Sequence, residues 1–185
     1  LTTGAVTVAL SGTTITATSL NSLDANSSQT VNAGGVATIT GAAADANTAY
    51  ASSGISGLGN ETVTLSDTTV AASVLNTLDG NTTGSVDAST VTTLTGSTSD
   101  ISAAYASSGI TGLGNEAVTI TDKTVAASAL NTLDGNTTGS IDASSLTKLT
   151  GTSADAKTAF DSAGINLTFD ACLLYTSPSP RDEKV

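Results

Sequence analysis

The stretch Asn76-Thr77-Leu78-Asp79-Gly80-Asn81 decides the fold, because the chain contains it in three versions. It returns as Asn21-Ser22-Leu23-Asp24-Ala25-Asn26 and as Asn131-Thr132-Leu133-Asp134-Gly135-Asn136, each time at the same 55-residue offset. A constant offset without insertion or deletion is typical of an array in which each unit packs on a similar neighbour. The sequence therefore predicts a repeat protein rather than a domain built around one site.

The 55-residue offset also fixes the domain boundaries. It relates Tyr50, Tyr105 and Phe160, and it relates Gly54, Gly109 and Gly164. We divide the chain into a partial lead-in at 1–5, repeats at 6–60, 61–115 and 116–170, and a non-native tail at 171–185.

Each repeat is predicted to contain two strands and two short helices. In the second repeat, Val63-Thr64-Leu65 alternates apolar and polar residues, as a half-buried strand does. Residues 68–80 have helical spacing and end on a glycine. A second extended stretch at 86–94 precedes a capping box at 97–100, and the helix that this box begins is expected to end at Gly109.

The spacing of these elements predicts the architecture. Gly80, Gly109 and Gly135 follow one another at the coil length of an α/β solenoid such as a leucine-rich repeat, roughly 20–29 residues. We predict an α/β repeat fold, a solenoid of β-α-β-α units with a stacked parallel sheet on one face and short helices on the other. The expected core includes Leu75, Leu78, Leu94, Ile101, Tyr105 and Ile110. The alternative is a string of small β-rich beads, each of which would have a marginal core.

Composition excludes several classes of function. The 185 residues include 36 Thr and 25 Ser but no His, and the net charge is −11. Without His the usual general base and zinc ligand are missing, and without a basic patch nothing attracts nucleic acid or anionic lipid. No apolar run is long enough to span a bilayer. No catalytic constellation stands out, and we expect no enzyme activity.

Aspartates recur in columns and are the candidate metal ligands. In stacked coils their carboxylates would repel one another unless they were solvated or bridged, and calcium accepts six to eight oxygen ligands in irregular geometry. The candidate calcium ligands are Asp24, Asp79, Asp134, Asp67, Asp122, Asp87 and Asp142. No EF-hand spacing and no calcium-binding nonapeptide occurs, so turn and cap chemistry is the alternative interpretation. Asparagine columns, such as Asn21, Asn76 and Asn131, are expected to satisfy backbone groups of turns.

Threonine triplets suggest a second kind of surface. Thr14-Ile15-Thr16, Thr38-Ile39-Thr40, Thr62-Val63-Thr64 and Thr93-Leu94-Thr95 each place two Thr side chains on one face of a strand. On a flat stacked sheet these would form a lattice of hydroxyl and methyl groups of the kind seen in ice-binding solenoids. The alternative is that Thr is simply a good strand former.

The end of the chain differs in composition from the repeats. Residues 172–182 contain the single Cys, both Pro residues and the single Arg. They read as the translation of a transposase mosaic end and the adjoining adapter used to prepare sequencing libraries. We therefore expect this tail to be adapter read-through, and the alternative is a genuine disordered tail. On the first interpretation Cys172 has no redox or metal role.

The repeat motifs resemble a known class of sequence. Val63-Thr64-Leu65-Ser66-Asp67, Leu75-Asn76-Thr77-Leu78-Asp79 and Tyr105-Ala106-Ser107-Ser108-Gly109-Ile110 are similar to tandem repeats of giant cell-surface, adhesin-like proteins of marine bacteria, including cyanobacteria. The resemblance spans residues 6–170.

That resemblance implies an extracellular stalk or spacer in a secreted or cell-surface protein involved in adhesion or surface-layer organisation. The implied partners are neighbouring repeats of the same chain and cell-surface or carbohydrate ligands, without nucleic acid or membrane insertion. A ligand-binding module for calcium, carbohydrate or ice is the alternative.

Overall fold

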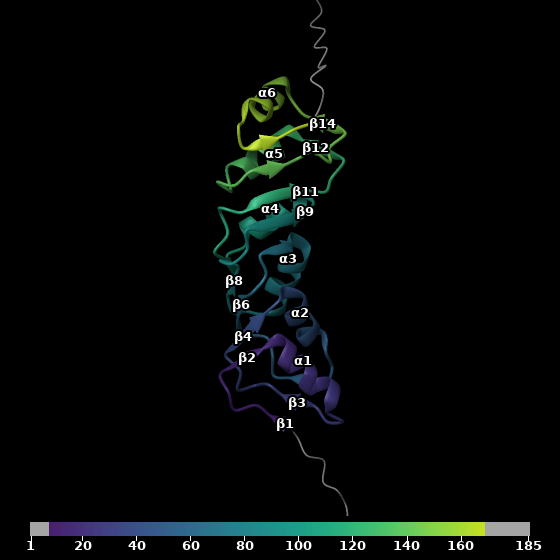
Figure 1. The fold of residues 1–185 in the computed structure, drawn as a ribbon, viewed down its shortest axis with the longest axis vertical. Coiled ribbons are helices and arrows are strands. Elements are labelled where there is room, and N and C mark those ends of the chain that lie inside the picture. The colour runs from purple at the N-terminus through teal and green to yellow at the C-terminus, as the bar shows by residue number, and fades with distance from the viewer. Residues whose placement is uncertain (1–7, 169–185) are drawn as a thin grey trace, which may run out of the picture.

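A computed structural model describes residues 8–168 as an elongated array whose two ends lie at opposite poles (Figure 1). The helices of this described part are α1 (Ala17–Asn26), α2 (Ala43–Ala51), α3 (Ala72–Asn81), α4 (Thr98–Ala106), α5 (Ala127–Asp134) and α6 (Ser153–Asp161). The lead-in at 1–5 and the tail at 171–185 lie outside the described residues.

Short strands connect the helices. They are β1 (Val8–Ala9), β2 (Thr14–Thr16), β3 (Val31–Asn32), β4 (Thr38–Gly41), β5 (Ile55–Ser56), β6 (Thr62–Leu65), β7 (Thr69–Ala71), β8 (Val86–Asp87), β9 (Thr93–Gly96), β10 (Ile110–Thr111), β11 (Ala117–Ile120), β12 (Thr124–Ala126), β13 (Ile141–Asp142), β14 (Lys148–Thr150) and β15 (Ile165–Asn166). All of their pairings are parallel. The predicted α/β repeat architecture with stacked parallel strands is confirmed.

The sheets cross the boundaries between repeats. One five-stranded sheet has the order β10-β8-β6-β4-β2, and the next has the order β15-β13-β11-β9-β7. In the first, β2 and β4 belong to repeat 6–60, whereas β6, β8 and β10 belong to repeat 61–115. The second sheet joins repeats 61–115 and 116–170 in the same way. Separate beads would share no sheet, so the structure has the solenoid and not the bead architecture.

The helices change their position relative to the strands along the array. Strands pair at a nearly constant spacing along the chain, as Thr14 with Thr38 and Val63 with Val86 show. Helices begin further apart, at Ala17, Ala43 and Ala72. A column of strands that precedes α1 and α2 therefore becomes the column that follows α3 and α4. Each helix nevertheless packs on the next one along the chain, from α1 to α6.

The core is a continuous apolar column of Leu, Ile, Val and Ala. Leu75, Leu78, Leu94, Ile101 and Ile110 are buried as predicted, whereas Tyr105 is half-buried. Because the unit is small and nearly free of aromatic residues, each coil depends on its neighbours for burial. Within residues 8–168, none of the helices has the length and apolar character required to cross a membrane.

Helix ends follow the sequence signals in part. The Ser97 side chain accepts from the backbone N–H of Asp100, so the predicted N-cap is confirmed. The Asp100 carboxylate accepts from the Ser97 hydroxyl, which replaces the reciprocal bond of a full capping box. The glycine stops are less regular. Helix α3 continues through Gly80 to Asn81, and α4 ends at Ala106, ahead of Gly109. The backbone N–H of Ser107 donates to carbonyls of the last turn of α4, so this helix closes without a glycine cap.

Candidate functional site

The first aspartate column joins each odd-numbered helix to the loop after the next helix. Asp79 Oδ2 accepts a hydrogen bond from the Ser107 hydroxyl at 2.7 Å, and the carboxylate lies directly over Gly109. A Cβ atom at Gly109 would be 2.0 Å from Asp79 Oδ1, so the carboxylate would have to move away. The same contact recurs in the other repeats, with Asp24 on Ser52 and Gly54 and with Asp134 on Ser162 and Gly164. The column thus fastens one coil to the next.

The aspartates of the second column cap the N-termini of helices that lie one coil earlier in the chain. Asp67 Oδ2 accepts from the backbone N–H of Ala43 at 2.8 Å, and Asp122 Oδ2 accepts from the N–H and hydroxyl of Thr98 at 2.6 and 2.8 Å. A carboxylate at a helix N-terminus satisfies an otherwise free N–H and interacts favourably with the helix dipole. Asp67 and Asp122 therefore hold α2 and α4 in place.

The third aspartate column forms turns. Asp87 Oδ1 accepts from the backbone N–H of Ser89 at 3.0 Å, and Asp142 does the same with Ser144. The hydrogen bonds from the Ser89 hydroxyl and backbone N–H lower the pKa of the Asp87 carboxyl, because they stabilise its charged form. Ser144 lowers the pKa of Asp142 in the same manner.

The structure gives each of these seven candidate calcium ligands a protein partner. Within residues 8–168, no group of three or more His, Cys, Asp or Glu side chains lies close enough together to hold a metal ion. Calcium binding stays a prediction, and a calcium titration followed by thermal melting tests it.

Two buried glutamates form a site that the sequence analysis missed. Glu61 and Glu116 are fully buried at the start of their repeats. The Tyr50 and Tyr105 hydroxyls donate to Glu61 Oε2 and Glu116 Oε2, each at 2.9 Å. Backbone N–H groups donate as well, from Gly59 to Glu61 and from Gly114 to Glu116. Each glutamate thus ties the last helix of one repeat to the first strand of the next.

Burial changes the acid–base properties of the two tyrosines. Burial and the adjacent glutamate raise the pKa of Tyr50 and Tyr105 well above the usual tyrosine value. Glu61 Oε1 makes no hydrogen bond to the described residues, whereas both Glu116 oxygens accept from Gly114. In the sequence this site could have been found from the motif Gly-Leu-Gly-Asn-Glu, which recurs at 57–61 and 112–116 and contains both Glu residues of the repeats.

Asparagine columns also link coils. Asn21, Asn76 and Asn131 each donate from Nδ2 to the backbone carbonyl of an aspartate in the next helix, at 2.9 to 3.0 Å. These acceptors are Asp45, Asp100 and Asp155. The predicted structural role of these asparagines is confirmed, although the acceptors lie in helices and not in turns.

The threonine triplets meet in register. Thr14, Thr38 and Thr62 pair side by side, and so do Thr16, Thr40 and Thr64. The residues between them, Ile15, Ile39 and Val63, point to the other face, and the latter two are buried. Strands β2, β4 and β6 therefore carry six outward threonines in two rows. The equivalent strands β7, β9 and β11 carry less regular rows of threonine, because Ala71 and Ala117 take threonine positions.

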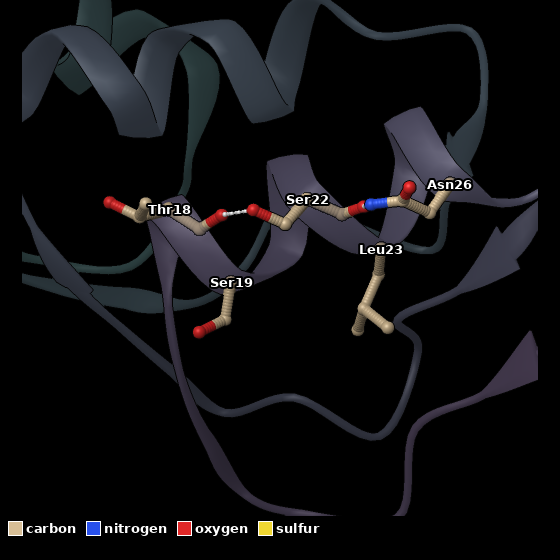
Figure 2. Close-up of a pocket in the computed structure, with 5 residues that line it drawn as sticks. All are labelled: Thr18, Ser19, Ser22, Leu23 and Asn26. Atoms are coloured by element: carbon tan, nitrogen blue, oxygen red, sulfur yellow. Dashed lines mark hydrogen bonds between the residues drawn. The ribbon is translucent and has the colours of Figure 1, made fainter.

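A shallow groove lies along α1. It is lined by Thr18, Ser19, Ser22, Leu23 and Asn26, and Ser19 and Leu23 point to the same side of the helix (Figure 2). Leu23 is 36% exposed, whereas the equivalent Leu78 and Leu133 are fully buried. The groove is thus the part of the helix that a preceding helix covers elsewhere in the array.

Comparison of the chain with protein-family models, with curated proteins and with solved structures found no match.

Proposed function

We propose that this chain is a structural stalk or spacer segment of a large secreted or cell-surface protein that serves adhesion or surface-layer organisation. The observation that supports the proposal is the sharing of each five-stranded sheet between two repeats. A unit that shares its sheet with the next unit cannot pivot freely at the boundary, so the array keeps its length and direction. On this proposal the chain is extracellular and has no catalytic role.

Two contacts support a rigid boundary between repeats, and a third supports rigidity within a repeat. The Tyr105 hydroxyl donates a hydrogen bond to Glu116 across one boundary, and the Tyr50 hydroxyl donates one to Glu61 across the other. Within a repeat, Asp79 is bonded to Ser107. Hydrogen bonds to buried charged groups are each worth about 1.5–3 kcal/mol, which makes bending at these points costly.

A force measurement on the full chain tests the stalk role. With handles at both termini, a rigid array should hold its length at low force and then lengthen in discrete steps. If one repeat is the unit, each step releases about 55 residues, on the order of 200 Å of extended chain. A Gly/Ser-rich chain of equal length is the control, because it extends smoothly from zero force. Smooth extension of the protein itself would contradict the proposal.

The surface location needs its own measurement. Antibodies raised against this chain should label intact, unpermeabilised cells of the source organism. Labelling that requires permeabilisation would contradict an extracellular role while leaving the mechanical result unaffected.

Ice binding is a second candidate function, and the register of β2, β4 and β6 favours it. Adjacent strands are about 4.8 Å apart, and alternate residues along a strand are about 6.6 Å apart. The six outward threonines of these strands therefore present hydroxyl and methyl groups at regular intervals in two directions.

Thermal hysteresis of the full chain tests this second candidate. Thr40→Lys places a charge in the centre of the array and should abolish hysteresis. Thr95→Lys is the matched control, because Thr95 holds the equivalent place in a sheet whose rows are interrupted by alanine. Equal hysteresis in both variants, or none in the native chain, would rule the threonine array out as an ice-binding surface.

A further inference from the structure

Glu61 carries a buried carboxylate that no basic side chain neutralises. The residue is fully buried, and within residues 8–168 it forms no salt bridge. The first basic residue in the sequence is Lys123, whose ammonium group donates to the backbone carbonyl of Ser145. A buried carboxylate is stable only when hydrogen bonds, an opposite charge or a metal ion compensate for its lost hydration. The partners of the two Glu61 oxygens therefore decide how this charge is held.

The hydrogen bonds at Glu61 are confined to one of its two oxygens. Oε2 accepts from the Tyr50 hydroxyl at 2.9 Å and from the backbone N–H groups of Gly59 and Asn60 at 2.8 and 3.1 Å. Oε1 is also buried, but it has no hydrogen-bond partner among the described residues. An ionised carboxylate has lone pairs on both oxygens, and a buried acceptor without a partner costs free energy. This cost indicates that Oε1 has a partner outside the chain.

Glu116 shows that the same motif can use both oxygens. The sequence Gly-Leu-Gly-Asn-Glu is identical at 57–61 and 112–116. At Glu116, however, the N–H of Gly114 donates to Oε1 at 2.7 Å and to Oε2 at 3.0 Å, and the Tyr105 hydroxyl donates to Oε2. Both oxygens of Glu116 therefore have protein partners. The unpaired oxygen is specific to the boundary between the first two repeats.

Two hydroxyl groups lie beside the Glu61 carboxylate. The Tyr50 hydroxyl is bonded to Oε2, and the hydroxyl of Thr82, a buried residue, donates to the backbone carbonyl of Glu61 at 2.6 Å. Burial raises the pKa of Tyr50, and a hydrogen bond with the Thr82 side chain acts in the opposite direction. One carboxylate and two hydroxyls thus gather at this point. Oxygen atoms of this kind are the ligands that hard cations prefer.

We propose that Glu61 Oε1 binds a monovalent cation, Na⁺ or K⁺, at the boundary between repeats 6–60 and 61–115. The charge of the site favours a monovalent ion, because one positive charge balances one buried carboxylate, whereas a divalent ion would leave an excess charge buried. Calcium also takes about six to eight oxygen ligands, and within residues 8–168 no group of three or more acidic side chains gathers to supply them.

The bound cation strengthens one boundary and leaves the other unchanged. Glu61 connects α2, through Tyr50, to the strand β6 that follows it. A cation on Oε1 stabilises the charged form of the carboxylate on which this connection depends. The boundary at Glu116 does not respond, because its carboxylate is satisfied by the chain. This cation dependence goes beyond the stalk role and does not depend on it.

Urea unfolding of the full chain in mixtures of sodium chloride and tetramethylammonium chloride tests the proposal. The total salt stays constant, so screening is constant, and tetramethylammonium is too large for a buried site. A ligand that binds only the folded state raises the ratio of folded to unfolded chain in proportion to its concentration, once this exceeds the dissociation constant. Each tenfold rise in sodium should then raise the ratio about tenfold. Potassium chloride forms a second series.

Glu61→Gln and Glu116→Gln are the matched variants, because each removes one buried carboxylate and keeps the size of the side chain. Glu61→Gln should lose the dependence on sodium or potassium, whereas Glu116→Gln should keep it. Sodium-23 NMR of the native chain gives a direct measurement. In excess tetramethylammonium, which displaces loosely held sodium from the acidic surface, a bound ion should still broaden the resonance, and Glu61→Gln should remove that broadening.

Each other result overturns the proposal. Equal stability of the native chain in all three chloride salts would show that a water molecule or a proton meets Oε1 instead. Loss of the cation effect in both variants would show that it depends on total charge and not on this site. A larger effect of calcium, abolished only by Glu61→Gln, would assign the site to a divalent ion. Circular dichroism verifies folding, and if Glu61→Gln does not fold, absence of broadening in the native chain refutes the site.

Discussion

Replacing Gly109 with alanine tests whether the Asp79 column holds the coils together. A Cβ at Gly109 would lie 2.0 Å from Asp79 Oδ1 and 3.1 Å from its Cγ. The carboxylate would have to rotate away and release the Ser107 hydroxyl, which it accepts at 2.7 Å. Gly109 is not among the glycines with positive φ, so alanine meets no backbone strain there.

The size of the effect follows from two opposing contributions. Loss of a hydrogen bond to a charged group costs about 1.5–3 kcal/mol. Reduced freedom of the unfolded chain on replacing glycine by alanine stabilises by about 0.4–1 kcal/mol. Gly109→Ala should therefore lower the free energy of unfolding by roughly 1–2 kcal/mol. Urea denaturation followed by circular dichroism measures this change.

The sign should reverse when the carboxylate is absent. In an Asp79→Ala background the added methyl group has no oxygen to displace, so Gly109→Ala should stabilise by about 0.4–1 kcal/mol. Gly80→Ala is the matched control, because nothing lies within 4 Å of a Cβ at Gly80 in α3. It should stabilise by about 0.5–1 kcal/mol in either background.

The double-mutant cycle decides between the carboxylate and the backbone as the source of the effect. If Gly109→Ala destabilises equally with and without Asp79, the close contact with the carboxylate is not what requires glycine. The proposed role of the aspartate column as a fastening between coils would then be refuted.

Three further predictions use the same denaturation assay. Leu78→Ala should cost about 2–5 kcal/mol because Leu78 is fully buried, whereas Leu23→Ala should cost less than about 1 kcal/mol because Leu23 is 36% exposed. Equal costs would contradict the coverage of α3 by α2. Tyr105→Phe should cost about 1–3 kcal/mol at pH 8. Because the pKa of Tyr105 is raised in the folded state, native stability should be complete below pH 10 and fall above it, and the variant should fall less; parallel curves would refute this origin. Asp87→Asn should keep the turn, as Asn32 does in the first repeat. Since the pKa of Asp87 is lowered by folding, its contribution is present above about pH 4 and lost below it, so the variant should lose less stability in acid.

Sequence reasoning worked well wherever the answer depended on local pattern. The 55-residue period, the alternation at Val63-Thr64-Leu65 and the capping box at Ser97 each predicted an element that the structure contains. These signals are local, because strand alternation and helix capping involve residues only a few positions apart.

The sequence did not predict hydrogen bonds between residues that lie about one coil apart in the chain. Asp67 caps Ala43 across 24 residues, and Asp79 fastens to Ser107 across 28. An aspartate column looks the same in sequence whether it binds calcium or a neighbouring coil. Glu116 was not predicted, because its repeated Gly-Leu-Gly-Asn-Glu motif does not by itself indicate that the glutamate is buried.

The sequence by itself determined that this chain is a tandem array of short strands and helices, because periodicity and propensity are written in each unit. Only the tertiary structure decided how the units join. Strands pair at a nearly constant spacing while helices recur at wider intervals, so every five-stranded sheet spans two repeats. Hydrogen bonds between coils set this difference between the two spacings, and residues far apart in the sequence form those bonds.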